Sequence, residues 1–203
     1  MPLDEVALLP QESVRSAFPK RYERSLRFRF KEDMLRCLGG AALLRGVLGA
    51  GEDDIVCGKF GKPYLKKGDL FFSISHSGEY VVLAVDDREI GADIEQIDSR
   101  HLSLAPHVFT ADELVWYRSR EEERFYVLWT LKESVIKQLG VGLQMTPQSF
   151  SVLPLTRGEG IDAGLRRLYG STAICNGHCI SVCTEHPAGN LTPRILRAPG
   201  LSL

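Results

Sequence analysis

The order of the predicted elements indicates an α+β fold that is built from two similar halves. A helical segment followed by β-strands occurs twice along the chain, and the sequence contains no internal repeat or low-complexity tract. The 203 residues are enough to bury a sizeable hydrophobic core. We expect a first half over residues 1–97 and a second half over residues 98–203, joined near Gln96–His101.

The first half contains one predicted helix and three predicted strands. Apolar residues recur at helical spacing within Lys31–Gly51, and glycines near the end of this segment terminate the helix. The pair Gly39–Gly40 weakens the helical pattern, because glycine has a low helix propensity. The segment Phe71–Ile97 predicts three strands, with turn signals at Gly78 and at Asp86–Asp87.

The second half repeats this order. A capping box at Thr110–Glu113 predicts the start of a helix. The segment Glu122–Gly140 predicts a longer helix with one apolar stripe, which the final glycine ends. Strands are predicted in Ser149–Leu155 and on both sides of the hairpin turn Asn176–Gly177. The last residues, His186–Leu203, have the composition of a loosely tied tail.

The charge and hydropathy patterns exclude several classes of protein. Lys and Arg number 25 against 26 for Asp and Glu, so the net charge of −1 gives no support for nucleic-acid binding. The apolar runs are too short to span a bilayer, and no membrane association is expected. The first ten residues carry acids where an export signal would carry cations, so we expect a cytoplasmic location.

Three of the five cysteines lie close together near the C-terminus, and zinc is one explanation for them. Cys175, Cys179 and Cys183 surround His178, but the paired spacing of a structural zinc site is missing. The turn at Asn176–Gly177 favours a simple hairpin instead. The odd number of cysteines and the lack of an export signal favour reduced thiols.

Two carboxylates alternate with apolar residues in the third predicted strand. Asp93 and Glu95 are two residues apart and therefore point to the same face of the strand, while Ile90, Ala92 and Ile94 point to the other. A solvated face of an edge strand is the favoured explanation when the pattern is taken alone. The alternative is a pair of acidic ligands above a buried sheet.

A third carboxylate and two cations lie on the long helix of the second half. Glu133 and Lys137 project from one flank of its apolar stripe, and the simpler explanation is an ordinary i,i+4 ion pair. Lys132 falls inside the stripe beside Trp129, so its stem is expected to be buried or its ammonium to serve a partner. If the three carboxylates converge, they form an all-oxygen site that suits magnesium and a phosphate group. No phosphate-binding P-loop motif is present.

Five motifs in this order resemble the 4′-phosphopantetheinyl transferase superfamily, and in particular its monomeric, two-half Sfp type. They extend over most of the chain, from about Lys20 to Val182, and comprise Gly61–Pro63, Phe72–Gly78, Ile90–Glu95, Phe109–Glu113 and Leu128–Leu143. The resemblance implies a pseudo-twofold pair of α/β halves with the active site and coenzyme A between them. It also implies a monomer.

The resemblance also implies roles for individual residues. Asp93, Glu95 and Glu133 match the ligands of Mg²⁺, for which Mn²⁺ is a possible substitute. Glu133 and Glu113 are both candidates for the general base, and Lys137 matches a lysine near the pyrophosphate. The residues expected to bind the cofactor are Arg21, Arg24, Arg36, Lys62, Pro63, Ser75, His76, Asp93 and Lys137. For the arginines a solvated basic segment is the alternative explanation.

The implied activity is transfer of the 4′-phosphopantetheine group of coenzyme A to a serine of an apo acyl or peptidyl carrier protein. Adenosine 3′,5′-bisphosphate is the second product, and the nucleophile belongs to the carrier protein. The alternative is a module that binds coenzyme A or a nucleotide without transferring anything. Cys37 departs from the family pattern, because the best-known relatives carry a hydroxyl residue there, and one phosphate contact is therefore in doubt.

Overall fold

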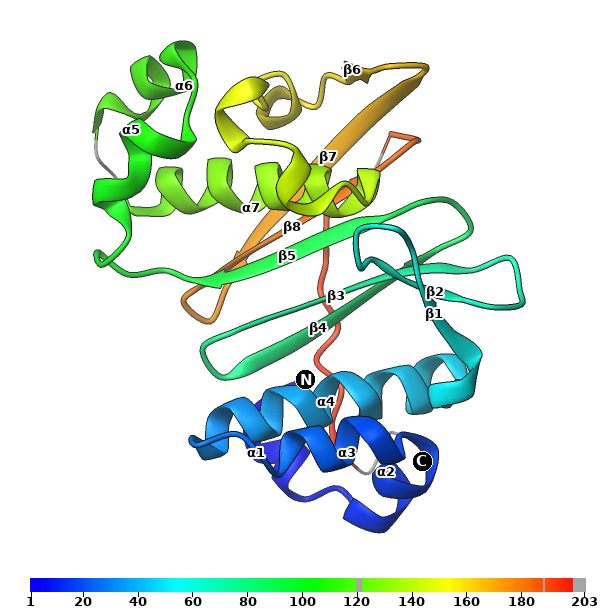
Figure 1. Ribbon diagram of the computed structural model, residues 1–203. Helices are drawn as coiled ribbons and strands as arrows, with labels where there is room; N and C mark the ends of the chain where they lie inside the picture. Colours follow the sequence, from blue (N-terminus) through cyan, green and yellow to red (C-terminus); the bar gives the residue numbers. More distant parts are fainter. Residues whose placement is uncertain (120–121, 188, 199–203) are drawn as a thin grey trace.

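Helices lie at both ends of the molecule and the β-strands lie between them, as the computed structural model shows (Figure 1). The structure describes residues 1–119, 122–187 and 189–198. The α-helices in these ranges are α1 (Leu3–Ala7), α2 (Gln11–Ala17), α3 (Pro19–Ser25), α4 (Lys31–Leu48), α5 (Ala105–Val108), α6 (Ala111–Trp116) and α7 (Glu122–Leu139). Short 3₁₀ helices are η1 (Glu52–Asp54), η2 (Leu102–Leu104), η3 (Tyr117–Ser119), η4 (Gly142–Gln144), η5 (Pro147–Ser149) and η6 (Leu155–Arg157). The α+β class is therefore confirmed.

The strands form three antiparallel groups. They are β1 (Ile55–Cys57), β2 (Pro63–Leu65), β3 (Phe71–Ser77), β4 (Tyr80–Asp86), β5 (Gly91–Gln96), β6 (Ile161–Ala163), β7 (Arg166–Cys175) and β8 (His178–Thr184). β1 pairs with β2, β3 pairs with β4, and the third sheet has the order β5-β8-β7-β6. The third strand of the first half thus joins the sheet of the second half, because β5 pairs with β8 in antiparallel register.

β3 and β5 lie side by side without a backbone ladder between them. Serine side chains make the connection, since the amide of Ala92 donates to Ser73 Oγ at 2.9 Å and the amide of Gln96 donates to Ser77 Oγ at 3.1 Å. Ser75 also faces β5 and donates to Asp93. We call Ser73, Ser75 and Ser77 the serine seam. It connects the β3–β4 pair to the four-stranded sheet at the predicted carboxylates.

The predicted helix of the first half is α4, and Gly49 ends it in the left-handed conformation with φ of 65°. Its internal glycines serve close packing. A Cβ on Gly39 would lie 3.0 Å from side-chain atoms of Val6 and Val81, and a Cβ on Gly40 would lie 3.2 Å from the Arg21 guanidinium. The low helix propensity of these glycines is therefore offset by the close approach that they allow.

The predicted elements of the second half are largely confirmed. α7 spans Glu122–Leu139 and is followed by Gly140 with φ of 64°. Asn176 and Gly177 have φ of 48° and 69°, as a type I′ hairpin requires. The capping box is present, because Thr110 Oγ1 accepts from the amide of Glu113 and the Glu113 carboxylate accepts from the amide of Thr110.

The predicted strand Ser149–Leu155 is wrong. This segment is a loop between η5 and η6, and its polar backbone groups are bound by side chains instead of a neighbouring strand. The amide of Val152 donates to Glu113, and the carbonyl of Phe150 accepts from Lys132. Hydrogen bonds to buried charged side chains thus replace the backbone hydrogen bonds of a β-ladder.

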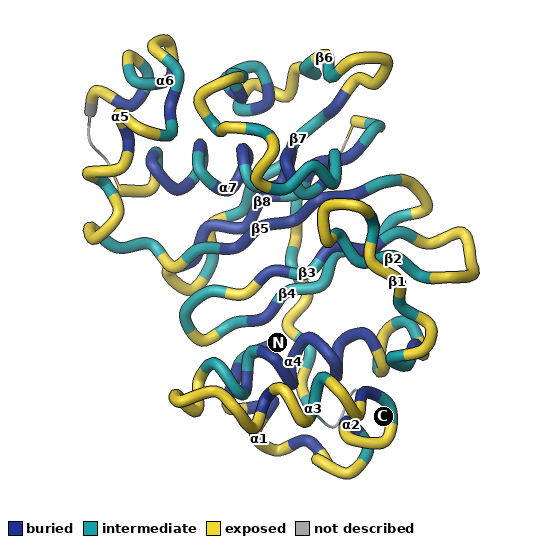
Figure 2. The backbone as a smooth tube through the Cα atoms, viewed as in Figure 1, coloured by how far each residue is buried: buried dark blue, intermediate teal, exposed yellow. Residues whose placement is uncertain are grey.

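Each half has its own hydrophobic core. The first core contains Leu44 of α4 and Val81 of β4, and the second contains Leu128 of α7 and Leu168 of β7. Figure 2 shows buried backbone along α4, α7 and the strands between them. None of the described helices combines the length and the apolar character needed to cross a membrane.

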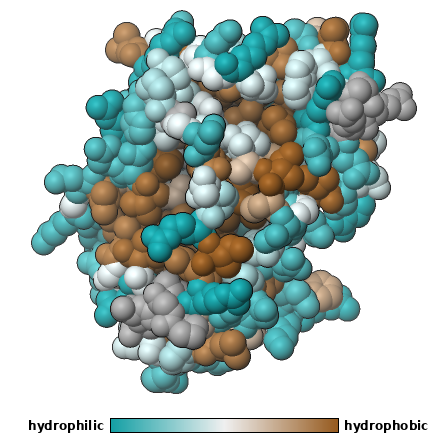
Figure 3. Space-filling model, turned by 180° about the vertical axis from the view of Figure 1, so that it is seen from behind, coloured by the Kyte–Doolittle hydropathy of each residue, from teal (hydrophilic) through white to brown (hydrophobic). Residues whose placement is uncertain are grey.

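The described part of the C-terminal segment contacts the N-terminal part of the molecule. The prediction of a loosely tied tail is therefore wrong for residues 189–198. The Arg197 guanidinium lies 2.8 Å from Glu5, whose carboxylate also accepts from the amide of Ala198 at 3.0 Å. Leu196 packs against the first core. The segment borders an apolar hollow of about 730 Å³ on the back of the molecule (Figure 3).

Candidate active site

Asp93 lies at the centre of the site and is 3% exposed. Its Oδ1 accepts hydrogen bonds from Ser75 Oγ at 2.7 Å and from Lys137 Nζ at 2.6 Å. Its Oδ2 is buried and has no hydrogen-bond partner among the described residues. Burying a charged oxygen without a partner is costly, so this atom points to a missing ligand.

Gly91 allows β5 to approach α7 closely enough to place Asp93 there. A Cβ on Gly91 would lie 1.9 Å from the carbonyl oxygen of Ser134 and 2.3 Å from the amide nitrogen of Gln138. No side chain fits at that distance. Glycine two residues before the carboxylate is therefore a requirement of the site.

Glu95 stands next to Asp93 on the same face of β5. Its Oε2 accepts from Ser77 Oγ at 2.6 Å, and the Trp129 side chain also donates to its carboxylate. Burial raises the pKa of Glu95, the charge of Asp93 raises it further, and the two hydrogen bonds oppose the change.

Glu133 faces these two carboxylates from α7. Burial raises the pKa of Glu133, and the negative charges of Asp93 and Glu95 add to this effect. Lys137, one turn later on the same helix, opposes it. The structure therefore brings together the three carboxylates that were expected to bind a metal.

The spacing of these carboxylates is wider than in a preformed three-ligand cluster. Among the described residues, only Asp86, Asp87 and His186 place one ligand atom each within 4.8 Å of the others. Asp93, Glu95 and Glu133 do not meet that spacing. An all-oxygen set with one unpartnered oxygen still fits Mg²⁺, because this ion usually binds one or two carboxylates and keeps several waters.

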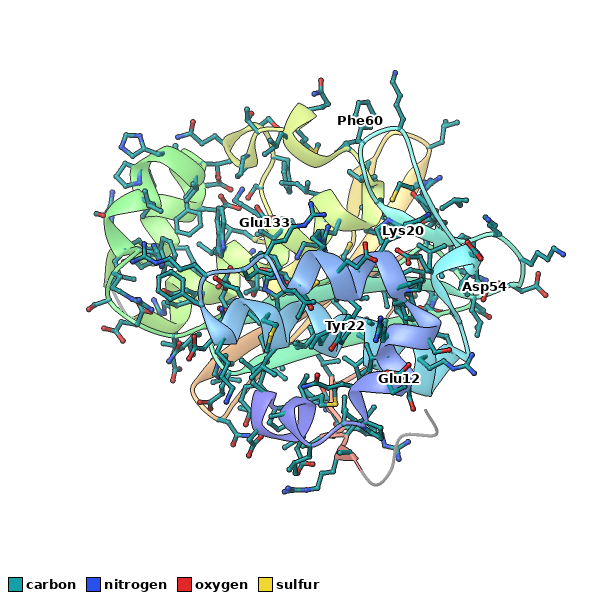
Figure 4. All side chains as sticks on the ribbon, turned by 60° about the horizontal axis from the view of Figure 1, so that its bottom comes forward. Glu12, Lys20, Tyr22, Asp54, Phe60 and Glu133 are labelled. Carbon is teal, nitrogen blue, oxygen red and sulfur yellow. The ribbon has the colours of Figure 1, made fainter. Side chains whose placement is uncertain are left out.

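Lys137 links the carboxylates to an adjoining pocket. Its ammonium donates to Ser75 Oγ at 2.9 Å as well as to Asp93, and the side chain is partly exposed. The pocket has a volume of about 440 Å³ and lies between Phe60 and Glu133, both labelled in Figure 4. Trp129 and Ile136 of α7 form part of its apolar wall.

Arg36 of α4 contacts the turn that follows His76. The Arg36 guanidinium donates twice to the carbonyl of Gly78, at 3.0 and 2.7 Å, and once to Asp33 at 2.7 Å. Partial burial lowers the pKa of His76, and the charges of Arg36 and Lys137 lower it further. The positive charges of Arg36 and Lys137 therefore act on a His76 imidazole that is mainly neutral at neutral pH, and the two cations suit an anion-binding site.

Arg21 and Arg24 converge on Cys37 of α4. Arg24 Nη2 lies 3.8 Å from the Cys37 sulfur, and that thiol faces the carbonyl of Arg21 at the same distance. Burial lowers the pKa of Arg21, whose guanidinium reaches over Gly40. Arg21 and Arg24 thus lie together beside α4, while Arg36 makes its contacts elsewhere, with Gly78 and Asp33.

The ammonium group of Lys62 forms its hydrogen bonds within the protein. It donates to Glu89 at 2.5 Å, to the carbonyl of Ile90 at 3.1 Å and to the carbonyl of Gln138 at 3.0 Å. Burial lowers the pKa of Lys62. Lys62 and Pro63 nevertheless border the 440 Å³ pocket, so they contribute to its wall.

The structure does not bring Glu113 to the carboxylate group. Glu113 is 0% exposed, and its oxygens accept from the amides of Thr110 and Val152 and from Lys132 Nζ, each at 2.8 Å. Lys132 in turn donates to the carbonyls of Pro147 and Phe150. The buried lysine of the apolar stripe therefore forms an ion pair with Glu113 and hydrogen-bonds to the loop after α7.

Sequence reasoning missed Gly91, Ser77 and Trp129 as parts of the site. The alternation of serines in β3 was a usable signal, because residues 73, 75 and 77 share one face just as Asp93 and Glu95 do. Of the three cysteines near the C-terminus, Cys179 and Cys183 lie in the second core, where burial raises the pKa of each to about 12, while Cys175 is half-buried.

Comparison with known proteins agrees with this geometry. The family model of the 4′-phosphopantetheinyl transferase superfamily matches residues 89–183, which include β5, α7 and the hairpin. The chain is 34% identical to 4′-phosphopantetheinyl transferase Sfp of Bacillus subtilis (strain 168), over 83% of this chain and 82% of the relative. It is 33% identical to 4′-phosphopantetheinyl transferase psf-1 of Bacillus pumilus, over 80% of this chain and 76% of the relative.

A more distant relative is the L-aminoadipate-semialdehyde dehydrogenase-phosphopantetheinyl transferase of Rattus norvegicus. It is 34% identical over 73% of this chain and 57% of its own length. The match to the bacterial relatives covers 80–83% of the chain. The chain belongs to the 4′-phosphopantetheinyl transferase superfamily.

Proposed function

We propose that this enzyme transfers the 4′-phosphopantetheine group of coenzyme A to a serine of an apo carrier protein at the site around Asp93. The observation that carries the proposal is the asymmetry of the Asp93 carboxylate. One oxygen is held by Ser75 and Lys137, while the other is buried and has no hydrogen-bond partner in the part of the chain that the structure describes. Such an arrangement is suited to a cation and a phosphate group.

Asp93, Glu95 and Glu133 would hold Mg²⁺, or Mn²⁺ in its place. The ion would supply charge neutralisation at the pyrophosphate of coenzyme A. Burial is the largest cause of the raised pKa of Glu95 and of Glu133, and the neighbouring carboxylates add to it. A bound cation would offset both effects, which supports this assignment.

The donor is proposed to lie across the site with its phosphates on the cations. Lys137 and Ser75 are placed to bind the pyrophosphate. Arg36 and His76, with Arg21 and Arg24 beyond them, are proposed to bind the 3′-phosphate. The pocket of about 440 Å³ next to Lys137 is proposed to take the adenine, because it has apolar walls and borders on the same lysine.

In the reaction, the serine oxygen of the carrier protein forms a bond to the β-phosphorus of coenzyme A. The bond from that phosphorus to the bridging oxygen breaks, and adenosine 3′,5′-bisphosphate leaves with the bonding electrons. Glu133 is proposed to accept the serine proton, because it is partly exposed and its raised pKa makes it a better base. Lys137 would stabilise the charge that develops on the leaving group.

Glu113 is proposed to have only a structural role. Its oxygens are engaged by Lys132 and two backbone amides, so none is available to accept a proton from the carrier serine. Of the two candidates for the base, Glu133 is therefore the one we retain.

The finer architecture is also a proposal. Each half places one 18-residue helix, α4 or α7, against antiparallel strands, which supports a pseudo-twofold relation between residues 1–97 and 98–203. The serine seam would then join β3 to β5, the strand of residues 1–97 that pairs with the sheet of residues 98–203, in a monomer. Both halves contribute to the site, because Ser75 comes from β3 and Lys137 from α7.

The test is transfer to an apo carrier protein in the presence of coenzyme A and Mg²⁺. Mass spectrometry of the carrier and chromatography of released adenosine 3′,5′-bisphosphate should show equal amounts of both products. Asp93→Asn should remove both, while the exposed control Asp69→Asn should leave them unchanged. Binding of coenzyme A without either product would mean that the chain is a binding module.

A further inference from the structure

The connection between α3 and α4 exposes an unusual amount of apolar surface. Leu26, Phe28 and Phe30 are 62%, 42% and 57% exposed, and all three lie within five consecutive residues. Single exposed apolar side chains are common, whereas a local group of this kind marks a contact surface. We call residues 26–30 the α3–α4 loop.

The same loop is strongly cationic. Arg27 and Arg29 alternate with the apolar residues, and Arg24 and Lys31 flank them without an intervening acid. Within the part of the chain that the structure describes, Arg27 and Arg29 form no salt bridge. Arginine and phenylalanine are enriched at the centres of protein interfaces, so the composition favours a protein partner with acidic residues.

The loop connects two of the residues that are proposed to bind the cofactor, Arg24 before it and Arg36 after it. It leads directly into α4, and Arg36 is six residues after Phe30, or about 9 Å along a helix. Arg36 contacts the β3–β4 turn at Gly78, and its charge acts on His76. Arg24, just before the loop, contacts Cys37 on the same helix. A protein that brings a serine to the pyrophosphate would pass this loop.

We propose that the α3–α4 loop is the docking surface for an acidic face of the carrier protein, next to its modified serine. This inference rests on the proposed function, because it concerns the macromolecular substrate of the same site. The arginines would pair with acids of the carrier, and the three apolar side chains would pack against its surface. A membrane-surface element would normally present an amphipathic helix, whereas this loop is an irregular five-residue connection.

The test compares two loop variants with a matched control in steady-state transfer. One variant is Arg27→Glu with Arg29→Glu, and the other is Leu26→Ser with Phe28→Ser and Phe30→Ser. Serine suits the N-cap position that Phe30 occupies, so α4 should remain intact. The control is Lys66→Glu with Lys67→Glu in the exposed connection between β2 and β3.

The loop variants should raise KM for the carrier protein by roughly tenfold, the effect of weakening a few interface contacts. Their KM for coenzyme A and their kcat should stay within about twofold of wild type, and the control should match wild type throughout. Added salt should raise KM for the carrier protein more in the wild type than in the charge-reversed variant. Replacing acidic residues near the carrier serine with lysine should restore a low KM for that carrier in the charge-reversed variant.

An unchanged carrier KM in both loop variants would overturn the docking assignment while leaving the proposed function intact. Loss of binding to vesicles of anionic phospholipid, combined with an unchanged carrier KM, would assign the loop to a membrane surface and would also overturn it. Absence of transfer by the wild-type chain would be a failure of the proposed function instead.

Discussion

Two buried carboxylates, Asp93 and Glu113, differ in how completely protein groups satisfy them. Glu113 receives hydrogen bonds from two backbone amides and an ion pair from Lys132. Asp93 is buried almost as deeply, yet one of its oxygens has no partner among the described residues. A fully satisfied buried charge fixes the fold locally, whereas an unsatisfied one is available to a ligand. Burial and residue type alone do not separate these two roles.

The largest expected effect on stability is at Glu113. Glu113→Ala should lower the free energy of unfolding by about 3–5 kcal/mol, because it leaves the Lys132 ammonium buried without its carboxylate. Urea denaturation followed by circular dichroism measures this loss. The Mg²⁺ dependence of the remaining folded enzyme should match that of wild type. A normal stability combined with a changed Mg²⁺ dependence would place Glu113 in the active site after all.

The next effect concerns catalysis at Glu133. Glu133→Gln should lower kcat by about 10²–10⁴, the range that a general base contributes, and should change KM for coenzyme A much less. Rapid-quench measurement of phosphopantetheine transfer checks this. The matched variant Glu113→Gln should lose stability before it loses turnover per folded molecule. If saturating Mg²⁺ restored full turnover to Glu133→Gln, the residue would be a metal ligand without a proton-transfer role.

A smaller effect is expected at the cations that face the proposed 3′-phosphate. Arg36→Ala and His76→Ala should each cost about 1.5–3 kcal/mol of binding to coenzyme A. The cost should shrink with dephospho-coenzyme A, which lacks the 3′-phosphate. Ratios of kcat/KM for the two donors give the difference directly. Equal losses with both donors would assign these residues to the fold or to the carrier protein.

The smallest expected effect is a gain in stability of Glu133→Gln over the wild type, and this gain depends on pH. In the folded protein the pKa of Glu133 is raised above its ordinary value of 4.5, so the folded state binds a proton more tightly than the unfolded state. Stability should therefore fall as pH rises from 4.5 through the raised value. In chelator, Glu133→Gln should melt at a higher temperature than wild type at neutral pH, and the difference should disappear below pH 4.5. A variant that is less stable than wild type at neutral pH would contradict the assigned direction.

Local patterns predicted most of the fold but only part of the site. Capping residues, helical periodicity and a two-residue turn are short-range signals, and they identified α4, α7, the Thr110 cap and the hairpin at Asn176. The other partners of Glu113 were not visible in this way, because Lys132 and Val152 lie 19 and 39 residues further along the chain. The predicted strand around Val152 failed for the same reason.

Long-range contacts also explain what was missed near Asp93. The serine seam joins residues 18 to 19 positions apart, and Lys137 reaches Asp93 across 44 positions. The alternation of Asp93 and Glu95 showed that they share a face, but not which elements cover that face. Gly91 could not be identified as essential until the backbone of α7 was seen against it.

Direct measurement of divalent-cation binding is the sharpest test of the comparison between Asp93 and Glu113. Titration calorimetry with Mg²⁺, together with electron paramagnetic resonance of Mn²⁺, should be made on the wild type, Asp93→Asn, Glu113→Gln and Asp87→Asn. The last variant tests the only close ligand group in the described chain, Asp86 with Asp87 and His186. We expect Asp93→Asn to abolish binding in the presence of coenzyme A, and the other two variants to retain it when folded. Binding that survives in Asp93→Asn and disappears in Asp87→Asn would contradict the account.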